Sequence, residues 1–191
     1  MAKIAKYCIT MEQEFNIMQL VKRRLFAMRN GLIADTLRKA GSPFKIIFGL
    51  NIPQIKEIAD EFGFNKDLAD RLWANTTTRE SMLLAPMLMN PENISAERAI
   101  EMVKECPAPE ITDSLCHKLI RFLPESFEIA KKLAKEDNEM SRYAAIRLFW
   151  HHIASHHQEI KAIADKEYNS NCRLTKLPAQ QLLEEIDFLY E

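Results

Sequence analysis

The sequence predicts an all-α protein, and three observations support this prediction. Apolar residues recur at intervals of three or four along the chain, which is the spacing of one helix face. Runs of β-branched residues are absent, and 4 glycines and 8 prolines among 191 residues are too few for a turn-rich β sandwich. The connections between the expected helices are short, so consecutive helices should lie antiparallel, in either a closed bundle or an α-solenoid.

The first helical segment is expected to reach residue 39, where Arg38 and Lys39 suit a helix C-terminus and Gly41 then breaks the pattern. Its apolar stripe comprises Phe15, Met18, Val21, Leu25, Met28, Leu32, Ile33 and Leu37.

Local signals place the helices that follow. Pro53 suits the first residue of a helix, and Asn65 can cap a short one. Thr77 and Glu80 fit a capping box, ahead of a helix that Pro86 should kink or interrupt.

In the second half, Ser95, Pro109 and Pro124 are expected to begin three helices. A segment over 140–153 is apolar over much of its circumference and should be central, and helices over 159–168 and 178–190 complete the chain, with a flexible link at 169–171 between them. The helix from Pro109 has the apolar stripe Ile111, Leu115, Leu119 and Phe122.

Composition indicates a soluble globular protein, with 47% hydrophobic and 28% charged residues. We expect a single domain over residues 1–191. No uncharged apolar run is long enough to span a membrane, and the N-terminus lacks the apolar stretch of a signal peptide, so a cytoplasmic location is expected.

Charge is distributed unevenly. Residues 1–56 contain ten Lys or Arg and three Asp or Glu, a net charge of +7, whereas the whole chain carries −1. A basic region of this kind can attract phosphates, although solvated helix faces are the commoner explanation of such runs.

We find no recognisable cofactor site in the sequence. The four cysteines, Cys8, Cys106, Cys116 and Cys172, are widely spaced and are expected to be free thiols. His152 and His156 lie one helical turn apart and could share a metal, but no third ligand lies at suitable spacing, so we predict no metal. The glycines do not form a phosphate-binding loop, and we expect no nucleotide cofactor.

Asp113 is a candidate functional residue. It lies two residues from both Ile111 and Leu115, about 200° around the helix, so it points away from the apolar stripe, on the same side as His117. It could line a functional surface; the alternative is an ordinary exposed acid near a helix N-terminus.

Four blocks in the same order resemble one family. Residues 49–59 read GLNIPQIKEIA, similar to G-V-x-x-P-x-[IL]-[RK]-x-[IL]-A, and residues 72–85 contain LW followed by ESMLLA. Residues 109–116 read PEITDSLC, similar to W-D-x-x-D-x-[IL]-C, and residues 136–147 resemble S-x-N-E-W-x-R-R-x-A. The chain thus resembles the DNA alkylation repair family of HEAT-like helical repeat proteins, whose active members are alkylpurine DNA glycosylases.

The resemblance implies a fold and a binding surface. The fold would be a HEAT-like α-solenoid of about five to six antiparallel helix pairs, curved around duplex DNA with a basic concave face. Its expected phosphate contacts in this chain are Arg142, Arg79, Lys45, Lys22, Arg23 and Arg24.

The resemblance also implies a catalytic role for Asp113, whose carboxylate would stabilise the cationic sugar as a damaged base leaves. Three positions depart from the pattern of active members: Pro109 stands where the family has Trp, and Met82 and Tyr143 each stand where it has Arg. The chain is therefore a divergent member, without the aromatic contacts to the lesion.

Two functions are left open. In the first, the chain binds duplex or damaged DNA and, if it is an enzyme, releases N3- or N7-alkylated purines with Asp113 as its catalytic group. In the second, it has kept the fold and lost the chemistry, and is a helical-repeat scaffold that binds a protein partner.

Overall fold

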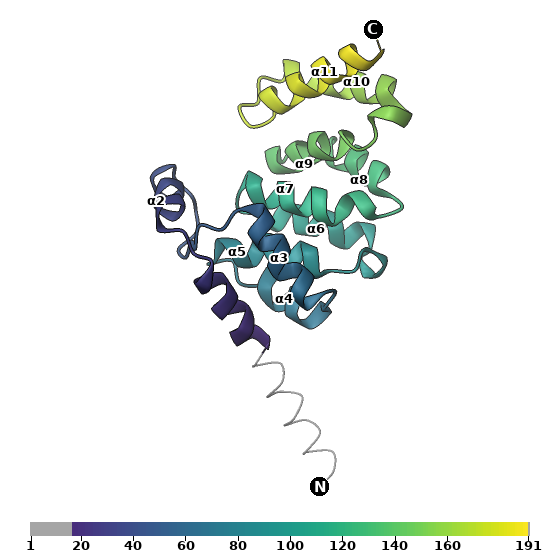
Figure 1. Cartoon of the computed structure of the whole chain (residues 1–191). Helices are drawn as coiled ribbons and strands as arrows, with labels where there is room; N and C mark the ends of the chain where they lie inside the picture. Colours follow the sequence, from purple (N-terminus) through teal and green to yellow (C-terminus); the bar gives the residue numbers. More distant parts are fainter. Residues whose placement is uncertain (1–16, 191) are drawn as a thin grey trace. The chain divides into compact units, whose positions relative to one another are not determined.

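A computed structural model describes residues 17–190, and within that range every regular element is a helix (Figure 1). The only pairing of β type in these residues is an isolated parallel bridge between Ile46 and Thr78. The all-α prediction is confirmed. Expectations that concern Phe15, Cys8 and the other residues before 17 lie outside the described residues.

The chain divides into two compact units, one ending at Asn90 and the other beginning at Pro91. The prediction of one domain over 1–191 remains a prediction. In the described residues, no helix is long and apolar enough to cross a membrane.

The first unit is built from short helices, and α5 packs on both α3 and α4. α5 continues through Pro86, so the helix does not begin again there. The elements are a helix over 17–27, α2 (Gly31–Lys39), α3 (Ile52–Phe62), α4 (Lys66–Trp73) and α5 (Arg79–Leu88).

The expected continuous helix up to residue 39 is wrong, because it is interrupted at Asn30. The Asn30 side chain accepts from the Ile33 N–H and caps α2, while its own N–H donates to the Phe48 carbonyl at 2.8 Å. Gly49 lies against this turn with φ +81°, and a side chain on it would collide with the Asn30 carbonyl. A contact with a distant loop therefore ends the first helix.

The predicted capping box of Thr77 and Glu80 is also wrong. Glu80 is completely buried, and its carboxylate accepts from the N–H groups of Phe48 and Gly49 at 3.0 and 2.9 Å. Arg79 donates to the same carboxylate at 2.9 Å. Glu80 thus organises the loop before α3 instead of capping its own helix.

Predictions from local caps are confirmed elsewhere. Asn65 caps α4, as predicted. Pro53 lies in the first turn of α3, which begins one residue earlier at Ile52 and has an unpredicted capping box of Asn51 and Gln54. Ser95 accepts from the Arg98 N–H at the start of α6. These signals are reliable because donor and acceptor lie within three residues.

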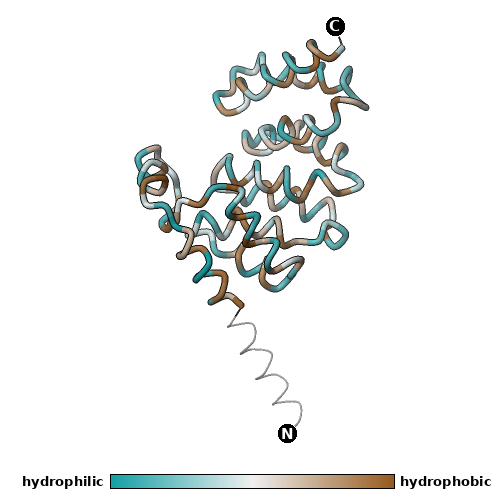
Figure 2. Tube along the Cα trace, in the orientation of Figure 1, coloured by the Kyte–Doolittle hydropathy of each residue, from teal (hydrophilic) through white to brown (hydrophobic). Residues whose placement is uncertain are grey.

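In the second unit, α9 packs against α6, α7, α8, α10 and α11, which confirms the prediction that this segment is central. Apolar and polar stretches are interspersed along these helices, as expected when each helix has one apolar face (Figure 2). The elements are η1 (Pro91–Asn93), α6 (Ala96–Glu105), α7 (Pro109–Lys118), η2 (Ile120–Phe122), α8 (Ser126–Leu133), α9 (Glu139–Phe149), α10 (Ile153–Asn169) and α11 (Lys176–Tyr190).

Several boundaries in this unit differ from the predictions. α8 begins at Ser126 rather than at Pro124, and α9 ends at Phe149 rather than continuing to residue 153. α7 ends at Lys118, so Phe122 leaves the expected stripe and is 54% exposed. α10 begins at Ile153 rather than near 159 and has an irregular residue at His156. The expected link at 169–171 is held by hydrogen bonds, because the Ser170 hydroxyl donates to the Glu167 carbonyl at 2.7 Å.

Candidate functional site

Asp113 lies on α7 and receives hydrogen bonds from two side chains of α9. The Tyr143 hydroxyl donates to Oδ1 and Oδ2 at 3.0 and 3.1 Å, and Arg147 Nε donates to Oδ1 at 2.7 Å. Tyr143 and Arg147 are four residues apart, so they project from the same face of α9, which packs on α7. These hydrogen bonds orient the carboxylate. The Asp113 side chain is 34% exposed, so the carboxylate is also accessible to solvent.

A chain of hydrogen bonds extends from this carboxylate to two histidines. Arg147 Nη2 lies 3.1 Å from His117 Nε2, and His117 Nδ1 lies 2.6 Å from His151 Nε2. A guanidinium can only donate, so His117 Nε2 must accept and the proton of this ring lies on Nδ1. That proton is donated to His151, so both rings are neutral in this arrangement.

The surroundings favour those protonation states. Burial lowers the pKa of His117, and the nearby Arg147 adds to this effect. Burial also lowers the pKa of His151, to about 4, with contributions from His117 and Arg121. Burial beside Asp113 raises the pKa of Tyr143, so its hydroxyl remains a donor.

Sequence reasoning found Asp113 but missed its partners. The sequence marks Tyr143 only as a departure from the family pattern and assigns no role to Arg147. Their spacing of four residues within block 136–147 was the available signal, because it places a phenol and a guanidinium on one helix face. Pro109 begins α7 and offers no aromatic ring, as the sequence indicates.

Arg142, a predicted DNA contact, is held within the second unit. Its Nε donates to Glu167 Oε1 at 3.1 Å, and its Nη1 donates to the carbonyl of Glu136 at 3.2 Å. Glu167 is 8% exposed and also accepts from the Thr175 hydroxyl. This cluster connects α9 to α10 and to the start of α11.

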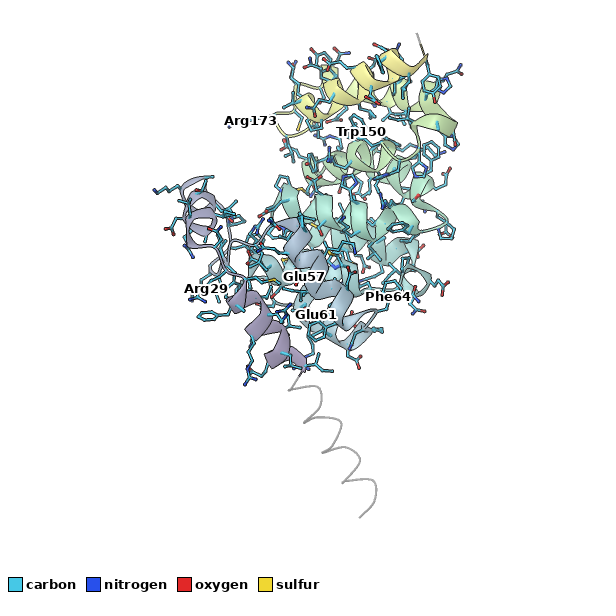
Figure 3. All side chains as sticks on the ribbon, viewed as in Figure 1. Arg29, Glu57, Glu61, Phe64, Trp150 and Arg173 are labelled. Carbon is cyan, nitrogen blue, oxygen red and sulfur yellow. The ribbon has the colours of Figure 1, made fainter. Side chains whose placement is uncertain are left out.

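Two predicted cations of the first unit are also held by carboxylates. Arg24 bonds to Glu57 at 3.2 Å and to Glu61, two acids of α3 that Figure 3 labels. Arg79 is buried, and it pairs with Glu80.

Lys22, Arg23 and Lys45 have exposed side chains. No ion pair joins any of the three to a carboxylate in the part of the chain that the structure describes. Asp113 and Arg142 belong to the second unit, whereas the other predicted cations belong to the first. That they share a concave face stays a prediction, as does DNA contact by all six cations.

No group of three or more potential ligands could hold a metal ion among residues 17–190. His152 Nε2 lies 2.8 Å from the Ser126 hydroxyl, and the rings of His152 and His156 both lie against Phe127, with ring centres 5.4 and 3.8 Å from that of the phenyl ring. The cysteines at 106, 116 and 172 are free and buried, as expected.

Comparison with known proteins gives a family and a fold. The family model described as DNA alkylation repair enzyme matches residues 21–185. A solved structure described as "A new family of proteins related to the HEAT-like repeat DNA glycosylases with affinity for branched DNA structures" has a TM-score of 0.77. It is 16% identical, and the match covers 88% of this chain and 74% of that one. The predicted HEAT-like α-solenoid is thereby confirmed. No curated protein matches the chain.

Proposed function

Because the chain belongs to the DNA alkylation repair enzyme family, we propose that it binds duplex DNA and releases N3- or N7-alkylated purines from it. The observation that supports catalysis most strongly is the geometry of Asp113. Its carboxylate is oriented by Tyr143 and Arg147 and remains 34% exposed. A fixed, accessible carboxylate is suited to stabilise a positive charge that develops on a substrate.

Alkylation at N3 or N7 gives the purine a formal positive charge, so the base can leave as a neutral molecule. The N-glycosidic bond breaks with its electron pair going to the base, which leaves a cationic sugar. Asp113 stabilises this cation electrostatically, and a water molecule adds to C1′ and loses its proton to Asp113 or to solvent. No other catalytic group is required by this scheme.

The two oxygens of Asp113 have different roles in this proposal. Oδ1 accepts from both Arg147, at 2.7 Å, and Tyr143, at 3.0 Å. Oδ2 accepts only from Tyr143, at 3.1 Å, among the bonds of the described residues. We assign Oδ1 to holding the group in place and Oδ2 to the sugar and the water.

For DNA binding, we propose that Lys22, Arg23 and Lys45 contact phosphates directly, since their side chains are exposed. Arg24, Arg79 and Arg142 are assigned supporting roles, because carboxylates already hold them. The affinity for branched DNA in the description of the similar structure supports DNA as the ligand class, so branched and blunt duplexes should be compared.

A salt titration tests the binding proposal. Affinity for a blunt duplex should weaken steeply as salt rises from low to physiological concentration, because each neutralised phosphate releases counterions. An alkylated duplex should bind at least as tightly as an unmodified one. If no duplex binds even at low salt, the DNA proposal fails.

The second candidate is a protein-binding scaffold without catalysis. One specific observation favours it: Leu177, Phe188 and Leu189 of α11 are all more than half exposed. Exposed apolar side chains of this kind can contact a protein partner. This candidate predicts no DNA binding at low salt and no release of alkylated bases.

A further inference from the structure

The first unit contains a pocket of about 420 Å³ that the proposed glycosylase chemistry does not use. This volume falls within the range of about 300–1,000 Å³ that is usual for small-molecule sites. The pocket is formed by the helix over 17–27, the loop before α3, the turn between α4 and α5, and the start of α5, so it lies entirely within one unit.

The walls of the pocket are apolar and partly aromatic. Leu25 is buried, whereas Phe26 and Ile46 are 56% and 44% exposed and lie at the opening. Phe48 adds a second aromatic ring. An exposed aromatic side chain at the opening of a pocket offers a flat surface on which a nucleobase can stack.

Phe26 is held in place by Arg29. The guanidinium of Arg29 lies 3.8 Å from the centre of the Phe26 ring, and its Nη1 donates to the Phe26 carbonyl at 2.8 Å. Figure 3 labels Arg29, which follows the helix over 17–27. A cation over one face of the ring fixes its orientation, so a ligand that stacks on the ring meets a prearranged surface.

The deeper part of the pocket is polar. Thr78 and Ser81 are buried, and their hydroxyls each accept from the Asn75 amide at 3.2 Å. Each hydroxyl keeps an O–H that can donate to a ligand. A purely hydrophobic ligand would offer no acceptor to these two O–H donors, whereas the edge of a base carries acceptors for them.

Charge at the opening matches phosphate. Lys22 and Arg23 line the pocket with exposed side chains, and the lining contains no carboxylate. Glu57 and Glu61 pair with the adjacent Arg24, and neither acid lines the pocket. The opening is therefore suited to an anionic ligand.

We propose that this pocket binds an unpaired nucleobase of a DNA strand, stacked on Phe26, with the adjoining phosphates on Lys22 and Arg23. The inference rests on the proposed function in one respect, that DNA is the ligand. It adds that the chain distinguishes DNA with an unpaired strand from a blunt duplex.

The test compares three labelled ligands by fluorescence anisotropy at one low salt concentration. These are a blunt duplex, the same duplex with a thymidine overhang, and the same duplex with an abasic overhang that keeps the phosphates. The wild-type chain should bind the thymidine overhang at least about fivefold more tightly than the abasic one, since stacking on an aromatic side chain contributes about 1–3 kcal/mol per base.

Phe26→Ala should remove this preference for the base and leave blunt-duplex affinity unchanged. Phe64→Ala is the matched control, because Phe64 is 67% exposed in the same unit but does not line the pocket (Figure 3). It should keep the full preference. Lys22→Gln should reduce the affinity for the thymidine overhang and for the abasic overhang by the same factor, because it removes a phosphate contact that both ligands share.

Equal affinity for the two overhangs, or a preference that survives Phe26→Ala, would overturn the inference. So would Phe26-dependent binding of a peptide rich in Glu and Leu without any preference for the base, which would assign the pocket to a protein. Binding of the blunt duplex shows whether a negative result contradicts only this inference or the proposed function as well. If the blunt duplex binds and the overhang adds nothing, only this inference fails; if no DNA binds, the proposed function fails as well.

Discussion

The Tyr143 hydroxyl donates to both carboxylate oxygens of Asp113, at 3.0 and 3.1 Å, and so joins α9 to α7. Tyr143 is 7% exposed, and its hydroxyl brings a fixed donor to a carboxylate that is otherwise open to solvent on one side. In this divergent chain, the phenol stands where the family pattern has a second arginine, and it orients the acid without adding a charge.

Tyr143→Phe tests this orientation. The substitution keeps the ring and its packing but removes the donor. We expect the free energy of unfolding to fall by about 1–2 kcal/mol, toward the low end for a hydrogen bond to a charged group, because the Asp113 carboxylate is partly solvated. If the site is catalytic, base release should slow about tenfold because the carboxylate is less well positioned. Chemical denaturation and single-turnover release measure the two effects. An unchanged release rate in an active protein would contradict the orienting role.

The pair of Arg142 and Glu167 predicts a loss of stability. Arg142→Gln leaves Glu167, which is 8% exposed, without its cationic partner. We expect the free energy of unfolding to fall by about 2 kcal/mol, less than for a fully buried ion pair. Lys135→Gln, which removes an exposed charge from the same unit, should leave stability nearly unchanged.

The same Arg142→Gln variant distinguishes a supporting role from a phosphate contact. A supporting role leaves the salt dependence of duplex binding unchanged. A phosphate contact would reduce the slope of log affinity against log salt by about 1, with little change in stability. We expect the salt dependence to be unchanged, as a supporting role predicts.

Lys22, Arg23 and Arg24 are consecutive, so they offer a matched comparison for DNA binding. Lys22→Gln and Arg23→Gln should each reduce the salt slope of duplex binding by about 1, because their side chains are exposed. Arg24→Gln should change the slope less, because Glu57 and Glu61 already bind that guanidinium. If the three variants have equal salt slopes, then the ion pairs of Arg24 with Glu57 and Glu61 do not keep its guanidinium from contacting DNA phosphates.

His151 predicts a dependence of stability on pH. Burial holds its pKa near 4 in the folded chain, whereas the ordinary value is 6.5. Between these values the unfolded chain binds more protons than the folded one, so stability falls as the pH drops through this window. His151→Gln should flatten this part of the profile. Thermal unfolding from pH 7 to pH 4.5 measures it, and parallel profiles for the two proteins would contradict the assignment.

Helices and caps could be predicted where the determinants are local. Asn65 and Ser95 cap helices through atoms three residues away, so their identity is enough. The break at Asn30 and the burial of Glu80 could not be predicted, because both depend on the loop around Gly49. That loop joins the two positions only once the unit has folded.

In the candidate site, too, local sequence predicts some features and only packing determines the others. Asp113 could be found from its place on a helix and from a resemblance in the surrounding residues. Its partners Tyr143 and Arg147 lie 30 and 34 residues away, and only the packing of α7 on α9 brings them to it. Likewise, the count of basic residues near the N-terminus could not reveal that Arg24 is held by two acids of α3.

The most direct test of the central claim is release of methylated purines from alkylated duplex DNA by the wild-type chain and by Asp113→Asn. This nearly isosteric change removes the charge and keeps the size of the side chain, and Asp137→Asn is the control for an exposed acid in the same unit. We predict that the wild type and Asp137→Asn release N3- and N7-methylpurines, and that Asp113→Asn binds the duplex but releases them at least about a hundredfold more slowly. Release by Asp113→Asn at the wild-type rate, or no release by any of the three proteins, would contradict the account.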